Sequence, residues 1–403
     1  MENCTPINEC LACGSTDLIP TLDLGNQPLA NNFRSGESMD TEEKYPLAIN
    51  RCQDCDHLQL THAVDPKLIY THYLYVSGTS DTYVQYMDWY AKFVREQFRH
   101  WTTRVLDIGC NDGSQLNAFK KIGYTTYGVD PAENLYATSS ANHNVICGFW
   151  NEDVTAKLDC NFDIISTQNA FAHNPNPLAY LQLAKQYLKA DGKIFISTSQ
   201  ADMVVNGEFD TIYHEHISYY NAESMQALAE RAGLHLIDVV KAPIHGTSYI
   251  FILAKEPLKK YRMENILATE SKLHSGSTYR NWAAGVEELL IGLKDQIDEY
   301  QHWGYRCIGY GAAAKGMTLL NASKITLDCV IDDNPLKQGL YCPGTTIPVV
   351  SSNYINQLPE TDKVIFIPLA WNFYDEIKRK IQKIRTNEHD MFLRYFPTIK
   401  TEA

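Results

Sequence analysis

The chain has 403 residues, of which 44% are hydrophobic and 21% are charged, and its formal net charge is −13. This length and composition indicate two or three globular domains. The acidic balance excludes general binding to nucleic acid polymers, and no apolar run is long enough for a transmembrane helix, so we expect a cytoplasmic protein with no membrane partner.

Two Cys-x-x-C pairs lie near the N-terminus, Cys10 with Cys13 and Cys52 with Cys55. Two intervening residues let both thiolates of a pair face one metal ion, and four cysteine ligands form a closed tetrahedral site. The sequence therefore predicts a structural zinc ion and not a catalytic one. Buried or redox-active thiols are the alternative, which the coincidence of two such pairs disfavours.

A tyrosine-rich stretch covers residues 65–80 and ends in a small polar loop, Ser77-Gly78-Thr79-Ser80. One interpretation is a solvated turn between helices. The other is a wall over a polar ligand, to which Tyr75 contributes its hydroxyl. Residues 83–100 then place apolar side chains at helical spacing, which predicts a packed helix.

A β/α alternation begins at Arg104, where a short apolar strand runs into the turn Gly109–Gly113. Asp130 ends the next predicted strand, about 20 residues after Gly109, where a carboxylate can accept hydrogen bonds from ribose hydroxyls. The pattern Asp-x-Gly-x-x-x-Gly is similar to the first motif of S-adenosylmethionine (SAM) methyltransferases, whereas a dinucleotide-binding Rossmann domain has G-x-G-x-x-G. Another nucleotide-binding α/β domain is the alternative. The residues that we expect to contact SAM are Asp107, Gly109, Asn111, Gly113, Asp130, Phe149, Trp150 and Asn169.

Groups that transfer protons near neutral pH follow this alternation. His173 comes just after the predicted strand 162–167, at the sheet edge where ligands bind in open α/β folds. The run Tyr213-His214-Glu215-His216 adds a phenol, two imidazoles and a carboxylate. Its two histidines share a face only if the run is extended, so one of them can be catalytic while the other is structural. We expect His216 to be the catalytic one.

Residues 260–303 are predicted to form long polar helices, and a second Rossmann-like unit starts at Arg306. Its turn Gly309–Gly316 offers backbone N–H groups at a helix start, and Lys315 adds positive charge, so this turn is a candidate diphosphate site. An empty structural Rossmann unit is the alternative.

Taken together, these motifs resemble the nucleotide-sugar C-methyltransferases, SAM-dependent enzymes that add a methyl branch to 4-keto-6-deoxy sugars. The late run Gly309–Gly316 and the run Phe209–His216 make the match specific. The resemblance implies an α/β fold with a zinc-binding N-terminal domain, a central Rossmann-like SAM domain and a C-terminal Rossmann-like domain. The expected segments are 1–70 (zinc binding), 71–200 (SAM binding), 201–255 (catalytic sugar contacts) and 256–403 (nucleotide-sugar binding).

The resemblance also implies roles for individual residues. His216 would be the general base, and the side chains around the sugar would be Tyr75, His173, Tyr213 and Glu215. The expected contacts to the nucleotide-linked sugar are His245, Ser248, Gly311, Lys315 and Lys337. The expected reaction is C-methylation at C3 of an NDP-linked sugar, with dTDP as the nucleotide, through an enolate. O-methylation of a small molecule, or an inactive zinc-organised binding protein, are the alternatives, and the chain is expected to be a monomer or a homodimer.

Overall fold

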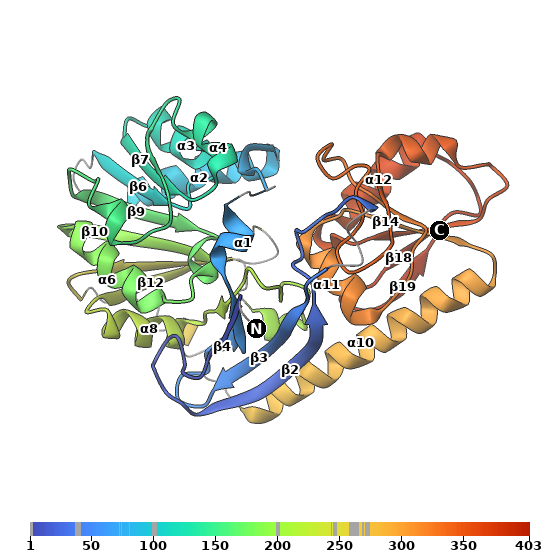
Figure 1. Ribbon diagram of the computed structural model, residues 1–403, viewed down its shortest axis with the longest axis horizontal. Helices are drawn as coiled ribbons and strands as arrows, with labels where there is room; N and C mark the ends of the chain where they lie inside the picture. The colour runs from blue at the N-terminus through green and yellow to red at the C-terminus, as the bar shows by residue number, and fades with distance from the viewer. Residues whose placement is uncertain are drawn as a thin grey trace. The chain divides into compact units, whose positions relative to one another are not determined.

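The computed structural model divides the chain into two compact units (Figure 1). The first unit comprises Met1–Pro20, Ile49–Ala201 and Glu215–His274, and the second comprises Thr21–Ala48, Asp202–His214 and Ser275–Ala403. The structure describes residues 3–36, 42–71, 73, 75–79, 81–98, 103–198, 202–242, 244, 248–257, 266–267, 270 and 275–403.

A seven-stranded sheet forms the centre of the first unit, in the order β12-β13-β10-β9-β6-β7-β8. Neighbouring strands from β10 to β8 are parallel, whereas β13 is antiparallel to both β10 and β12. The carboxyl ends of the parallel strands therefore share one edge, where ligands bind in doubly wound folds. The strands are β6 (Arg104–Ile108), β7 (Thr125–Asp130), β8 (Asn144–Cys147), β9 (Phe162–Gln168), β10 (Leu188–Thr198), β12 (His235–Ala242) and β13 (Ser248–Ala254).

Helices cover both faces of this sheet, because successive strand residues point to opposite sides. Val105 and Ile164 belong to the core with α2 and α3, whereas Leu106 and Ile165 belong to the core with α6 and α8 (Figure 1). The helices and turns of this unit are α1 (Pro66–Tyr70), η2 (Ser77–Thr79), α2 (Asp81–Glu96), α3 (Ser114–Lys121), α4 (Glu133–Ser139), α5 (Glu152–Thr155), η3 (Phe171–His173), α6 (Pro177–Tyr187) and α8 (Ala222–Arg231).

Two smaller sheets involve the N-terminal region. One pairs β1 (Cys4–Pro6) with β5 (His62–Val64), and the other has the order β11-β4-β3-β2. The members of the latter are β2 (Leu18–Gln27), β3 (Tyr45–Cys52), β4 (Leu58–Leu60) and β11 (Ser218–Tyr219). Between β11 and the large sheet, the backbone of Ile217 donates to Ala172 O at 2.9 Å and accepts from Leu60 N at 2.9 Å. This residue thus joins β4 to η3.

The second unit contains a six-stranded sheet in the order β16-β15-β14-β17-β18-β19, parallel except for β18 with β19. Its strands are β14 (Arg306–Tyr310), β15 (Cys329–Ile331), β16 (Val349–Val350), β17 (Val364–Pro368), β18 (Met391–Arg394) and β19 (Lys400–Glu402). Its helices and turns are α7 (Met203–Asn206), α10 (Gly276–His302), α11 (Ala314–Ser323), η4 (Ser352–Gln357), η5 (Trp371–Phe373) and α12 (Tyr374–Ile384).

The predicted α/β class is confirmed, with a C-terminal α/β sheet domain after the SAM-type sheet. Asp191 and Gly192 lie inside β10, where the register against β9 shifts between Leu188 and Lys193. The boundaries of the four predicted segments remain predictions. Among the described residues, none of the helices combines the length and apolarity that crossing a bilayer requires.

Replacing Gly109 tests how the sheet edge is built. Gly109 has φ +83°, and a Cβ there would lie 2.5 Å from Ala170 Cβ, whereas Gly25 has φ +74° with open space around it. Both alanine variants incur about 1–2 kcal/mol of left-handed backbone strain, and Gly109→Ala adds about 1–3 kcal/mol of overpacking. We expect Gly109→Ala to lower the urea midpoint clearly more than Gly25→Ala. Equal midpoints would contradict the close approach of the Ala170 loop.

Candidate active site

The four cysteines predicted to bind zinc converge at one point in the first unit. All four Sγ atoms lie within 4.8 Å of one another, with 3.6 Å from Cys10 to Cys55 and 3.5 Å from Cys13 to Cys52. A tetrahedral zinc ion with Zn–S distances of about 2.3 Å separates its sulfur ligands by about 3.8 Å. The geometry therefore fits zinc with all four positions taken by protein, and the predicted zinc-binding domain is confirmed.

The zinc cluster is tied to the strand that supports the proton-transfer groups. Gln59 on β4 accepts from Leu11 N at 2.8 Å and donates to Glu9 O at 2.9 Å, on either side of Cys10. Its backbone pairs with Ser218 on β11, two residues after His216. Gln59 thus links the backbone around Cys10 to β4 and β11, and a structural, non-catalytic role of zinc remains a prediction.

The turn after β6 forms the predicted cofactor loop. Gly109 N donates to Val129 O at 2.8 Å, and Asn111 has φ +51°. Asp130 ends β7 and accepts from Asn111 N at 2.8 Å and from Ala132 N at 2.9 Å. The carboxylate that we expect to receive the ribose hydroxyls is therefore fixed by two backbone donors.

Buried polar atoms at the same edge have no hydrogen-bond partner among the described residues, including Asp107 Oδ1 and Asn169 Oδ1. Asp107 is only 3% exposed, and this burial raises the pKa of its carboxyl group to about 7. Such atoms suit a cationic ligand with hydrogen-bond donors, and SAM carries an ammonium and a sulfonium group. The residues at this edge therefore fit SAM.

The other expected cofactor residues occupy different surroundings. Gly113 has φ +84° and caps α3, while Phe149 is half-buried in the loop after β8. Trp150 donates its indole N–H to Tyr180 O at 3.2 Å and packs against α6. Contacts of Phe149 and Trp150 with adenine remain predictions.

The proton-transfer groups of the first unit form a stacked cluster. The His173 ring lies 5.1 Å from the His216 ring and 5.4 Å from the Tyr70 ring. Glu215, which is 3% exposed, accepts from Tyr73 Oη at 2.8 Å. Burial lowers the pKa of His173 to about 4, so its imidazole is neutral at physiological pH, and its buried Nε2 has no partner among the described residues.

The run that contains these groups crosses between the two units. Tyr213, which is half-buried, and His214 belong to the second unit, whereas Glu215 and His216 belong to the first. His214 is 2% exposed, its Nε2 lies 3.2 Å from Tyr45 O, and burial lowers its pKa to about 4. These contacts fix the His214 ring, and which of the two histidines is catalytic remains a prediction.

The tyrosine-rich segment lies against the cofactor loop. Asn111 donates to Tyr75 O at 3.0 Å and accepts from Ser77 N at 2.9 Å, and Gly78 N donates to Asp112 at 3.0 Å. The Tyr75 side chain is 46% exposed. The segment therefore forms a wall beside this loop. Sequence reasoning missed Tyr70 and Tyr73, although the density of tyrosines was a usable signal.

The second unit repeats the loop-and-acid arrangement of the first. Gly311 N donates to Ile331 O at 2.7 Å, and Asp332 accepts from Ala312 N at 2.6 Å and from Asn334 N at 2.8 Å. Gly311 has φ +96° and precedes Asp332 by the same sequence separation as Gly109 precedes Asp130.

The residues predicted to contact the nucleotide sugar have the following neighbours in the folded chain. Lys315 lies 3.9 Å from Asp210 Oδ1 and over the Trp371 ring, while Lys337 donates to Ala312 O at 2.7 Å. Ser248 belongs to the first unit and donates to Ile244 O at 2.9 Å. His245 lies outside the described residues. Binding of the nucleotide sugar by these residues remains a prediction.

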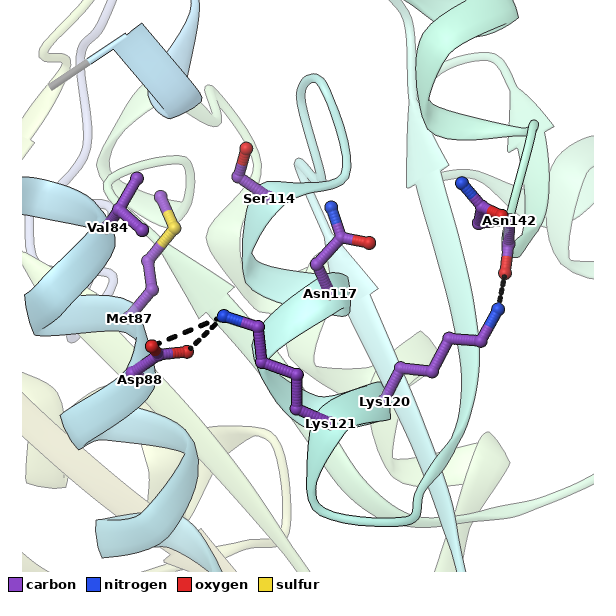
Figure 2. Close-up of a pocket in the computed structure, with 8 residues that line it drawn as sticks. All are labelled: Val84, Met87, Asp88, Ser114, Asn117, Lys120, Lys121 and Asn142. Carbon is purple, nitrogen blue, oxygen red and sulfur yellow. Dashed lines mark hydrogen bonds and ion pairs between the residues drawn. The ribbon is translucent and has the colours of Figure 1, made fainter. Parts of the chain in front are cut away.

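A surface hollow of about 500 Å³ lies between α2 and α3 (Figure 2). Two lysines enter it, but Lys121 pairs with Asp88 at 3.1 Å and Lys120 donates to Asn142 O at 2.9 Å (Figure 2). None of the residues predicted to be catalytic lines it, so this hollow is separate from the predicted catalytic residues.

The doubly wound sheet, the Gly109 loop and its acidic partner define a SAM-dependent methyltransferase. Comparison with known families agrees: residues 80–239 match a methyltransferase domain, residues 243–397 a C-methyltransferase C-terminal domain, and residues 10–70 a zinc binding domain. The predicted enzyme class, a SAM-dependent methyltransferase, and the predicted cofactors, SAM and zinc, are therefore confirmed.

Individual relatives cover different shares of the chain. C-methyltransferase NovU from Streptomyces niveus is 29% identical over 388 residues, which are 92% of this chain and 91% of NovU. Ubiquinone biosynthesis O-methyltransferase from Coxiella burnetii (strain Dugway 5J108-111) is 25% identical over 187 residues, 42% of this chain and 80% of that protein. Magnesium protoporphyrin IX methyltransferase from Synechocystis PCC 6803, in a crystal structure with bound SAM, is 14% identical over 43% of this chain and 79% of that chain, with a TM-score of 0.33.

Removing one zinc ligand should destabilise the first unit. Cys13→Ala leaves three thiolates, and we expect loss of bound zinc, measured by atomic absorption. A loss of about 3 kcal/mol would lower Tm by roughly 6–12 °C for a unit of this size. Cys160→Ala, which removes a half-buried thiol outside the cluster, is the control and should keep both zinc and Tm. Full zinc content in Cys13→Ala would contradict the four-cysteine site.

The pKa of Asp107 gives SAM binding a pH dependence. Because burial raises the pKa of Asp107 to about 7, its carboxyl group gains a proton as the pH falls through that value and then attracts the ammonium group less, so affinity should fall, approaching about tenfold per pH unit. Calorimetric titration with S-adenosylhomocysteine (SAH), which keeps that ammonium group, at pH 6 and pH 8 measures this. Asp107→Asn should bind more weakly at pH 8 and lose the dependence. Equal wild-type affinities at both pH values would argue against Asp107 as a ligand.

Proposed function

We propose that the protein transfers a methyl group from SAM to C3 of an NDP-linked 4-keto-6-deoxy sugar, with dTDP as the nucleotide. The observation that carries this proposal is the stacked pair His173–His216 beside the buried Glu215, in the same unit as the cofactor loop. Such a cluster suits proton abstraction next to a ketone, which turns a poorly nucleophilic sugar carbon into an enolate.

In this mechanism His216 is the general base. A ring nitrogen of neutral His216 accepts the proton from C3, and the C–H electron pair enters the enolate, whose charge rests on the C4 oxygen. Bound SAM supplies an electrophilic methyl group. The position of His216 is fixed by the backbone of Ile217, so the base does not need to be ordered when the substrate arrives.

The neighbouring groups stabilise the charge that develops. His173 is neutral at physiological pH, so one of its ring nitrogens carries an N–H that can donate a hydrogen bond to the developing charge. Glu215 suits a contact with a histidine N–H or a sugar hydroxyl. Tyr75 and Tyr213 complete the proposed sugar-binding set. Gly311, Lys315 and Lys337 of the second unit are proposed to hold the nucleotide part, while nucleotide contacts by Ser248 and His245 remain predictions.

The extent of the likenesses favours a carbon acceptor over an oxygen acceptor. The likeness to the O-methyltransferase covers 42% of the chain, whereas the likeness to a C-methyltransferase covers 92% and thus includes the zinc-binding and C-terminal domains. A cofactor domain shared by both relatives does not determine the acceptor, so the remaining domains carry the distinction.

Solvent exchange tests the base directly. The protein and a dTDP-linked 4-keto-6-deoxy hexose are incubated in deuterated water without SAM, and deuterium at C3 is followed by NMR. We expect exchange in wild type and a loss of about a hundredfold or more in His216→Asn, because a positioned general base contributes about 10²–10⁴-fold. His235→Asn, at an exposed position on β12, is the matched control. Unchanged exchange in His216→Asn would eliminate this residue as the base.

A further inference from the structure

Tyr73 is fixed at both its backbone and its side chain. Its N–H donates to Asn134 Oδ1 at 3.1 Å, and its carbonyl accepts from Asn134 Nδ2 at 2.9 Å. Its hydroxyl donates to Glu215 Oε2 at 2.8 Å. One residue therefore joins the first turn of α4 to the carboxylate next to the proposed base.

Asn134 follows Asp130, the acidic residue beside the predicted cofactor loop, by four positions in the chain. It lies in α4, just after the turn in which Asp130 accepts from Ala132 N at 2.9 Å. In the same turn, Glu133 N donates to Thr71 O at 3.2 Å. A ligand on the Asp130 carboxylate would therefore contact a turn that leads directly into Glu133 and Asn134. These two residues hydrogen-bond to the backbone of Thr71 and Tyr73.

We propose that Tyr73 is a positioning residue that couples occupancy of the SAM site to the orientation of Glu215, by way of Asn134. This inference rests on the proposed function. A carboxylate that is 3% exposed needs hydrogen-bond donors, and a phenolic donor to a charged acceptor is among the stronger ones. Tyr70 Oη donates to Glu215 O at 3.2 Å, so the main chain and the carboxylate of Glu215 are held from the same segment.

Hydrogen bonds and the first turn of α4 connect the cofactor loop to Glu215, which precedes the proposed base in the chain. A physical path shows where coupling can pass, but coupling itself is a free energy that has to be measured. Tyr75 differs from Tyr73: its side chain is 46% exposed, and its ring centroid lies 6.4 Å from that of Tyr73.

The test compares deuterium exchange at C3 of the keto sugar with and without saturating SAH. In wild type we expect SAH to accelerate exchange. Tyr73→Phe should slow exchange by about tenfold, as expected from losing one hydrogen bond to a charged group, and should abolish the acceleration. Asn134→Ala should also abolish it. Tyr136→Phe, at an exposed position on the same helix, should behave as wild type.

A second readout is independent of exchange. By linkage, the nucleotide sugar should tighten SAH binding in wild type, and this effect should disappear in Tyr73→Phe, as measured by calorimetry. Loss of coupling in a variant whose Tm is unchanged supports the inference. Coupling that persists in Tyr73→Phe, or its absence in wild type, overturns it. If binding of SAH and of the nucleotide sugar is coupled in wild type but no deuterium exchange occurs, the proposed function is contradicted and the coupling inference is not.

Discussion

The backbone of Ile217 is the constraint on which the proton-transfer site depends. It donates to Ala172 O and accepts from Leu60 N, so two hydrogen bonds hold the residue after His216 between η3 and β4. Because His173 is the last residue of η3, the same two hydrogen bonds limit the distance between the two imidazoles. Buried backbone groups are costly to leave unpaired, which makes this geometry hard to relax. The zinc cluster supports it indirectly, since Gln59 fastens β4 to the backbone around Cys10.

Buried polar groups in the first unit fall into two kinds. The buried Glu215 and the half-buried Asp130 already accept hydrogen bonds from Tyr73 and from backbone N–H groups. Asp107 Oδ1 and His173 Nε2 have none among the described residues. The first kind fixes the site, and the second kind is available to ligands. Groups that are oriented before the ligand arrives require little reorganisation during the reaction, which is how fixed dipoles lower a barrier.

Much of the architecture could be predicted from the sequence because it depends on local patterns. The spacing of the paired cysteines by itself predicts a tetrahedral metal site. The succession of strand, glycine turn and acidic residue around Gly109 and Asp130 by itself predicts a nucleotide-binding α/β sheet. The bond from Tyr73 to Glu215 could not be predicted, because it joins two irregular segments far apart in the chain and no periodicity marks it. The same holds for Asp210, a buried residue that accepts from Trp371 and Tyr395 through contacts of the folded second unit.

Transfer of a labelled methyl group tests the central claim most directly. The protein is incubated with SAM carrying a ¹³C methyl group and a dTDP-linked 4-keto-6-deoxy hexose, and the position of the label in the product is determined by NMR. We expect a methyl group bonded to ring carbon C3, with no hydrogen left on that carbon if C3 already carries a hydroxyl. A labelled methyl group on a sugar oxygen would contradict it.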